Sequence, residues 1–182
     1  MTELALHILD IAQNSIRANA SLIEIYITEN QKSDSYRIEI KDNGCGMNTA
    51  TLQRVTDPFY TTQTTRKVGL GLPLLKQNAE QTGGTLTIES WPGEGTDVIA
   101  VFGFKHFDRP ILGDIAGTIL ILLSNETGAE IFYRHQTLHG EFNFDSREIK
   151  KILGGMPIAT KEIREFLQAM LLENLEQIQI SG

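Results

Sequence analysis

Cysteine is almost absent from this chain of 182 residues, which has Cys45 alone. A single cysteine excludes an internal disulfide and is typical of a protein in a reducing compartment. We interpret Cys45 as a small, half-buried loop side chain rather than as a reactive thiol.

Long apolar segments and an excess of positive charge are also missing. The longest apolar run, GTILILLS at 117–124, is too short to cross a bilayer. The first twenty residues lack the charged leader and cleavage site of a secretion signal. The net charge of −7 gives no general attraction to nucleic acid or anionic lipid, so a bound polyanion must be recognised locally. These absences predict a cytoplasmic protein that binds neither nucleic acid nor membrane.

Hydrophobic periodicity divides the first 104 residues into helices and strands. The predicted elements are a helix over 3–18, strands over 22–27 and 35–42, a helix with Pro73 in its first turn and its end at Gly83, and strands over 85–90 and 96–104. Consecutive strand pairs separated by helices imply an α+β sandwich. A doubly wound sheet would instead need helix and strand to alternate one for one.

The character of the sequence changes after residue 104, which we take as the end of a first domain, 1–104. The second segment, 105–182, predicts an apolar helix over 113–124, a hairpin over 129–145, and helices over 146–155 and 160–178. Aromatic side chains of the hairpin look exposed; they are Phe132, Tyr133, Phe142 and Phe144. They form either a small core packed on the sandwich or a surface for dimerisation or partner docking.

Asp10 and Asn14 lie four residues apart in the first predicted helix, so both point from one face. A polar pair there conflicts with an apolar core, unless that face is solvated or lines a pocket. In a pocket, Asn14 would offer its amide oxygen to a hard cation. Asp10 would be placed to orient or deprotonate an attacking group.

The stretch KDNGCGM, residues 41–47, puts Asp42 at the end of a strand beside Gly44 and Gly46. The glycines would let this loop approach a ligand closely. A carboxylate only accepts hydrogen bonds, so it selects a group that donates them, such as the exocyclic amine of adenine. The same side chain could instead form an Asx-turn. In GEGT, Thr96 begins a strand where its hydroxyl could reach a base edge.

The stretch KVGLGLPLL puts Gly69 and Gly71 just before a helix. Backbone N–H groups at a helix start form an anion site, which glycines leave open to phosphate oxygens. Lys67 and Arg66 could add positive charge. The pattern is neither a Walker loop nor a Rossmann fingerprint. Together with the preceding motifs, it predicts the metal, adenine and phosphate contacts of one nucleotide.

In this order the motifs resemble those of the GHKL superfamily of gyrase, histidine kinase and MutL ATPases. DIAQNSIRANA resembles the N-box, DNGCGM the first glycine box, GLGLPLL the second, and GEGT the last turn. The likeness covers about residues 3–104. The segment from DPFYTT to GLGL is most similar to histidine-kinase catalytic domains, in which it forms the lid over ATP. The resemblance implies a Bergerat-type two-layer α/β sandwich that binds ATP and Mg²⁺.

The resemblance also implies roles for single residues. Asn14 would bind the magnesium ion, Asp42 the adenine amine, and Gly69 and Gly71 the phosphates. Residues around these positions in the boxes complete the expected nucleotide site; they are Gly44, Gly46, Met47, Lys67, Leu70, Leu72 and Thr96.

Two departures from the family pattern bear on catalysis. Hydrolytic members carry glutamate four positions before the asparagine, where this chain has Asp10, the candidate general base, with a side chain one methylene shorter. A histidine kinase also needs a phospho-accepting histidine on a preceding helical domain, and only nine residues precede Asp10. We expect His7 to be structural, and His106, His135 and His139 to lie at the surface without a phospho-accepting context.

The sequence therefore predicts a histidine-kinase-like protein that transfers the terminal phosphate of magnesium-ATP to a separate protein, on histidine, serine or threonine. One alternative is a conformational switch driven by slow ATP hydrolysis, which needs Asp10 as base and a transducer domain. Another is a nucleotide sensor that docks a partner through 105–182 without chemistry. A homodimer is left open.

Overall fold

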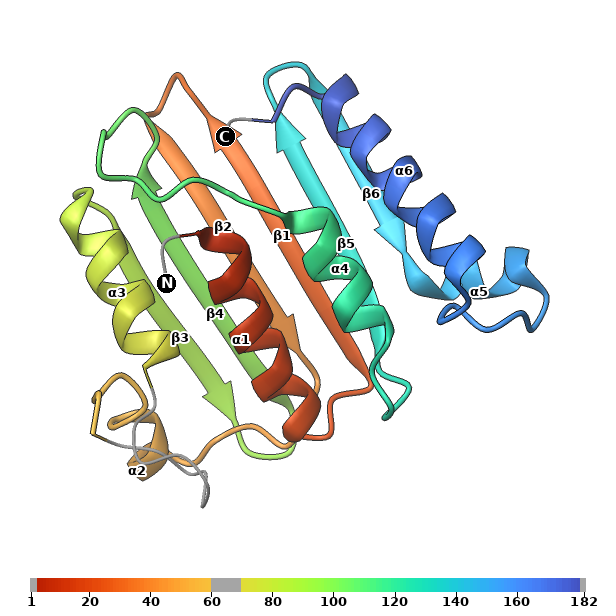
Figure 1. The fold of residues 1–182 in the computed structure, drawn as a ribbon. Coiled ribbons are helices and arrows are strands. Elements are labelled where there is room, and N and C mark those ends of the chain that lie inside the picture. The colour runs from red at the N-terminus through yellow and green to blue at the C-terminus, as the bar shows by residue number, and fades with distance from the viewer. Residues whose placement is uncertain (1–2, 60–69, 181–182) are drawn as a thin grey trace.

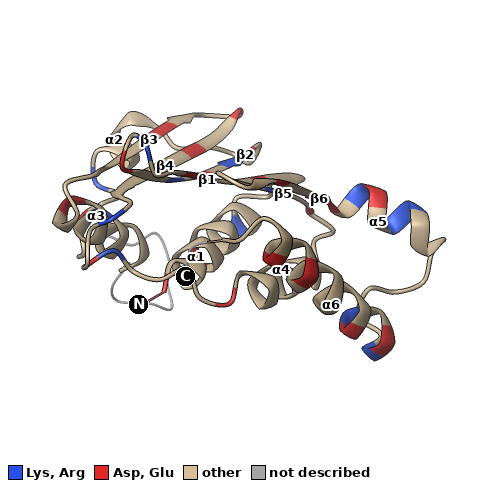
Figure 2. Ribbon diagram, turned by 90° about the horizontal axis from the view of Figure 1, so that it is seen from above, with Lys and Arg blue, Asp and Glu red and all other residues tan. Residues whose placement is uncertain are grey.

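The computed structural model describes residues 3–59 and 70–180, which form a six-stranded sheet with four helices against one face (Figures 1 and 2). The helices are α1 (Leu4–Arg17), α2 (Thr49–Leu52), α3 (Gly71–Gln81), α4 (Ile115–Leu123), α5 (Ser146–Leu153) and α6 (Lys161–Gln177). The strands are β1 (Leu22–Asn30), β2 (Ser35–Asp42), β3 (Thr85–Trp91), β4 (Gly95–Gly103), β5 (Glu130–Thr137) and β6 (Gly140–Asp145).

The sheet confirms the predicted α+β class. Its strand order is β3-β4-β2-β1-β5-β6. Neighbouring strands are antiparallel except β1 and β5, which pair in parallel. The short helix α2 was not predicted. It has four residues and begins at Asn48, whose side chain accepts a hydrogen bond from the Thr51 amide, so it is too short to show a hydrophobic period.

The core lies between the sheet and α1, α3, α4 and α6. Alternate residues of β1, namely Ile23, Ile25 and Ile27, are fully buried on the face that the helices cover. Burial of each such side chain stabilises the fold by about 1.5–3 kcal/mol. The opposite face of the sheet carries no helix layer among the described residues, as Figure 2 shows.

Residues after 104 extend this same sheet. Strand β5 pairs with β1, so Ile131 lies beside Ile23, and α4 packs between α1 and α6 (Figure 1). Two hairpin aromatics, Tyr133 and Phe144, are buried in the common core, and Phe132 and Phe142 are half-buried. Of the two alternatives that the sequence left open, packing on the sandwich therefore holds for these side chains, although they looked exposed from the sequence.

His135 is buried, which corrects its predicted position at the surface. It follows Ile131 and Tyr133 on the inner face of β5, so strand alternation carries it into the core. One ring nitrogen, Nε2, lies 2.8 Å from Oε1 of Glu29 on β1, and Nδ1 lies 2.7 Å from the Tyr133 hydroxyl. His139, at the tip of the hairpin, is exposed as predicted.

We expect His135→Leu to lower the free energy of unfolding by about 3–5 kcal/mol, because it removes one partner of a buried Glu–His pair. Urea unfolding of the purified variant measures this change. The matched control is His139→Leu, an exposed position in the same hairpin, for which a change within about 0.5 kcal/mol is expected. Similar small losses in both variants would contradict a structural role for the buried pair.

Candidate functional site

Asp42 is held at the end of β2 by two hydrogen bonds, one to each carboxylate oxygen. The hydroxyl of Ser15, on α1, donates to Oδ2 at 2.6 Å. The Gly44 amide donates to Oδ1 at 2.9 Å, which is the Asx-type contact that the sequence left open as an alternative. Each carboxylate oxygen has a second lone pair, so the group can still accept from a ligand. Asp42 is part-exposed, whereas Ser15 is buried.

Thr96 lies opposite Asp42 in the pairing of β4 with β2. Its hydroxyl is 2.9 Å from the hydroxyl of Ser90 on β3, which also accepts a hydrogen bond from the Met47 amide at 2.8 Å. The structure thus brings Asp42, Thr96 and Met47, three of the predicted site residues, to one corner. Sequence reasoning missed Ser15 and Ser90. Both residues could have been found in the sequence, because each is a serine at a position where the helical or strand period predicts a buried, apolar side chain.

The loop 43–47 is clamped between two other turns. The Cys45 amide donates to the Ala18 carbonyl, and the Gly93 amide donates to the Cys45 carbonyl, each at 2.8 Å. At Gly46, where φ is +64°, an added Cβ would lie 2.0 Å from the carbonyl oxygen of Trp91. Packing of the protein against itself therefore requires glycine here, a reason that the sequence interpretation did not contain.

The side chain of Cys45 is exposed, not half-buried as predicted. Both backbone polar groups of Cys45 are bonded within the protein, to Ala18 and to Gly93. These bonds anchor the main chain while the thiol stays accessible to solvent.

A second corner of the site joins α1 to the start of α3. Gly71 is the first residue of α3, and an added Cβ there would lie 1.9 Å from Oδ2 of Asp10. The carboxylate of Asp10 thus lies directly against the helix start, where backbone N–H groups have no partners within the helix. Leu70, just before the helix, is exposed, and Leu72 packs partly against the core. Lys67, Gly69 and Arg66 lie outside the described residues.

Asn14 is exposed one helical turn beyond Asp10 on α1. Its Oδ1 accepts a hydrogen bond of 2.8 Å from the guanidinium of Arg17. An amide oxygen has a second lone pair, so this atom can still face a cation. The described residues contain no group of three or more His, Cys, Asp or Glu side chains suited to a metal ion. A magnesium site in this part of the chain would therefore rest on Asn14 and on ligand oxygens.

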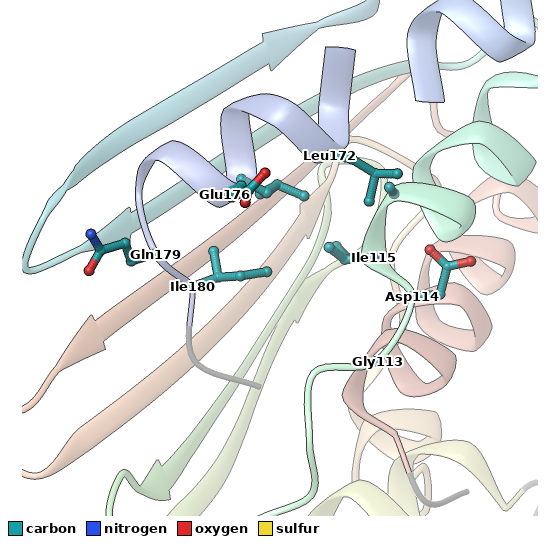
Figure 3. A pocket seen from close by; sticks show the side chains of 9 residues that line it. Gly113, Asp114, Ile115, Leu172, Glu176, Gln179 and Ile180 are labelled. Atoms are coloured by element: carbon teal, nitrogen blue, oxygen red, sulfur yellow. The ribbon is translucent and has the colours of Figure 1, made fainter. Parts of the chain in front are cut away.

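A cavity of about 520 Å³ lies elsewhere, between the start of α4 and the end of α6 (Figure 3). Ile115 and Leu172 line it, with Asp114 and Glu176 also bordering it. None of the predicted site residues takes part in this cavity. No helix in the described ranges, 3–59 and 70–180, is long and apolar enough to cross a membrane.

A two-layer α+β sandwich, with polar corners built from its first helix, the end of β2 and the start of α3, defines the ATPase class of the Bergerat fold. The family described as histidine kinase-, DNA gyrase B- and HSP90-like ATPases matches residues 2–106, and the chain belongs to this family. Membership confirms the predicted superfamily and implies ATP binding.

Two of the relatives that this chain is similar to are sensor kinases. The sensor protein kinase FleS of Pseudomonas aeruginosa is 39% identical over 90 residues, which cover 49% of this chain and 22% of FleS. The signal transduction histidine-protein kinase AtoS of Escherichia coli is 36% identical over 89 residues, which cover 48% of this chain and 14% of AtoS. This chain therefore spans about a fifth of FleS and less of AtoS.

One solved structure matches most of the chain. It is the N-terminal domain of a DNA repair protein, with a TM-score of 0.57 and 18% identity. The alignment covers 87% of this chain and 59% of that protein's chain. At this identity the likeness concerns the fold alone.

Proposed function

We propose that this protein binds magnesium-ATP between α1, β2 and α3 and transfers the terminal phosphate to a separate protein. The observation that carries the proposal is the double role of α1. Asp10 on this helix lies against Gly71 at the start of α3, and Ser15 on the same helix bonds Asp42. A single rigid helix would thus align the adenine corner with the phosphate corner.

Each corner supplies chemistry suited to one part of the nucleotide. Asp42 accepts hydrogen bonds, which suits the amine of adenine, and the Thr96 hydroxyl can bond the base edge. The start of α3 offers backbone N–H groups and a partial positive charge to the phosphates. Asn14 would present its amide oxygen to the magnesium ion, which when bound neutralises charge on the phosphates.

In this proposal, Asp10 orients or deprotonates the attacking group. In the transfer, the bond between the terminal phosphorus and its bridging oxygen breaks, and ADP leaves with that electron pair. A new bond forms from the phosphorus to a nitrogen or oxygen of the acceptor, and the proton that the acceptor loses passes to the carboxylate of Asp10.

The burial of two of the four histidines supports an acceptor on another protein. His7 and His135 are buried, with 1% and 0% of their surface exposed, so neither can receive a phosphate in the folded state. His106 is part-exposed, and His139 is exposed at the hairpin tip, between Leu138 and Gly140. The proposal does not specify whether the acceptor residue is histidine, serine or threonine. The experiment below identifies it.

The test follows ATP labelled on its terminal phosphate, with the purified chain, magnesium, and lysate from the source organism. Label on a lysate protein, absent with the Asp42→Asn variant, is the expected result and identifies the acceptor. If only free phosphate forms, and the Asp10→Asn variant does not form it, the protein is a hydrolytic switch and not a kinase. ATP binding without either product would leave a sensor, and the kinase proposal would be wrong.

Asn14→Ala is expected to weaken ATP binding in the presence of magnesium by about tenfold or more, because a cation ligand is lost. Binding of metal-free ADP should stay unchanged. Titration calorimetry with and without magnesium separates the two. The matched control is Gln13→Ala, a neighbouring amide on α1, which should alter neither affinity. Equal losses with and without magnesium would show that Asn14 does not act through the metal.

A further inference from the structure

His7 is a buried polar residue that the proposed chemistry does not use. It lies on α1 among the apolar residues Leu4, Ile8 and Ile11, with 1% of its surface exposed. Its Nε2 is 3.1 Å from Nδ2 of Asn78 on α3. An amide NH₂ group only donates, so Nε2 accepts this bond and the proton of the neutral ring lies on Nδ1. The hydrogen bond crosses from α1 to α3.

The other ring nitrogen of His7 is Nδ1, which carries the proton of the neutral ring. Nδ1 is buried and has no hydrogen bond of normal geometry among the described residues. Burial lowers the pKa of His7, and the nearby backbone of Gly71 and the carboxylate of Asp10 oppose this only in part. The ring is therefore neutral at pH 7. A buried N–H without a good partner costs free energy, so an apolar side chain would be the more stable choice if packing were its only role.

Two contacts join α1 and α3, one made by Asp10 and one made by His7. His7 precedes Asp10 by three residues on α1, and Asn78 follows Gly71 by seven on α3. Both spacings keep the paired residues on one face of their helix. The Asp10 contact involves Gly71, the first residue of α3, and the His7 bond involves the side chain of Asn78, two turns later in the helix.

We infer that His7 is a positioning residue for the phosphate end of the site. Its bond to Asn78 fixes the separation and rotation of α3 relative to α1, and so the distance of the first N–H groups of α3 from Asp10 and Asn14. This inference rests on the proposed function. According to this inference, His7 affects the contacts that α3 makes with phosphate. It does not affect the adenine corner, which Ser15 and Asp42 form.

The experiment compares His7→Leu, Asn78→Leu and His7→Gln with the wild-type chain, and measures the affinities for adenosine, ADP and magnesium-ATP. His7→Leu and Asn78→Leu should each lower the affinities for ADP and ATP by about tenfold. The affinity for adenosine should stay within about twofold of the wild-type value. His7→Gln keeps an acceptor for Asn78 and should restore most of the loss. The double variant His7→Leu/Asn78→Leu should bind no worse than the single ones, because both remove the same bond.

Equal weakening of adenosine and ATP would assign His7 a general structural role and overturn the inference, as would unchanged ATP affinity in both leucine variants. If His7→Leu does not fold, Asn78→Ala at its part-exposed position carries the same comparison. A wild-type chain that binds no adenine nucleotide would overturn the proposed function itself. Wild-type binding of ATP with an unaffected His7→Leu would overturn this inference alone.

Discussion

Asp42→Asn is expected to abolish adenine-nucleotide binding at the concentrations at which the wild-type chain is saturated. The substitution turns one accepting oxygen into an NH₂ donor, which then faces the donating amine of the base. The Gly44 amide can only donate, so the oxygen of the new amide stays on its side and the NH₂ group replaces Oδ2, beside the Ser15 hydroxyl, which can rotate to accept. The cost is at least about 1–3 kcal/mol, or about 5- to 150-fold in affinity. Titration calorimetry with ATP measures it.

The control for this variant is Asp97→Asn, the same chemical change on the same sheet. Asp97 follows Thr96 in β4, so strand alternation turns its side chain to the face opposite the site. Its ATP affinity should equal that of the wild-type chain. Unchanged affinity in Asp42→Asn, or equal losses in the two variants, would falsify the assignment of the adenine corner.

Gly46→Ala is expected to cost about 3 kcal/mol or more of stability and to reduce ATP affinity by more than tenfold. Its new Cβ would lie 2.0 Å from the carbonyl oxygen of Trp91, so the loop after β2 must move away from the turn between β3 and β4. That movement would displace Met47 from Ser90 and disturb the corner that Asp42 and Thr96 form. Urea unfolding and ATP titration measure the two effects.

Gly93→Ala provides the matched control. Gly93 also has a positive φ, +80°, and lies in the turn against which Gly46 packs, but an added Cβ there would meet no atom within 4 Å. Only the backbone strain remains, about 1 kcal/mol, and ATP affinity should hold. A similar loss of stability in both variants would mean that strain, and not the contact with Trp91, makes glycine necessary at position 46.

Local patterns in the sequence determined the elements and the order of the motifs. The alternation of Ile23, Ile25 and Ile27 predicts a half-buried strand because successive side chains of a strand point to opposite faces. Asp42 at a strand end and Gly71 at a helix start follow from the same local rules. These features depend on neighbours a few residues away, so each can be read without the fold.

The tertiary structure alone decided which of these local features meet. Asp10 lies against Gly71, sixty-one residues further along the chain, and Ser15 bonds Asp42 across twenty-seven. The pairing of β5 with β1 buries His135 in the core, whereas the sequence predicted this side chain at the surface. Glycine is required at position 46 because the carbonyl group of Trp91, from another turn, leaves no room for a Cβ. Contacts of this kind arise from strand pairing and helix packing between distant segments. The choice of partner segment produces no periodic pattern in the sequence, so these contacts could not be predicted from it.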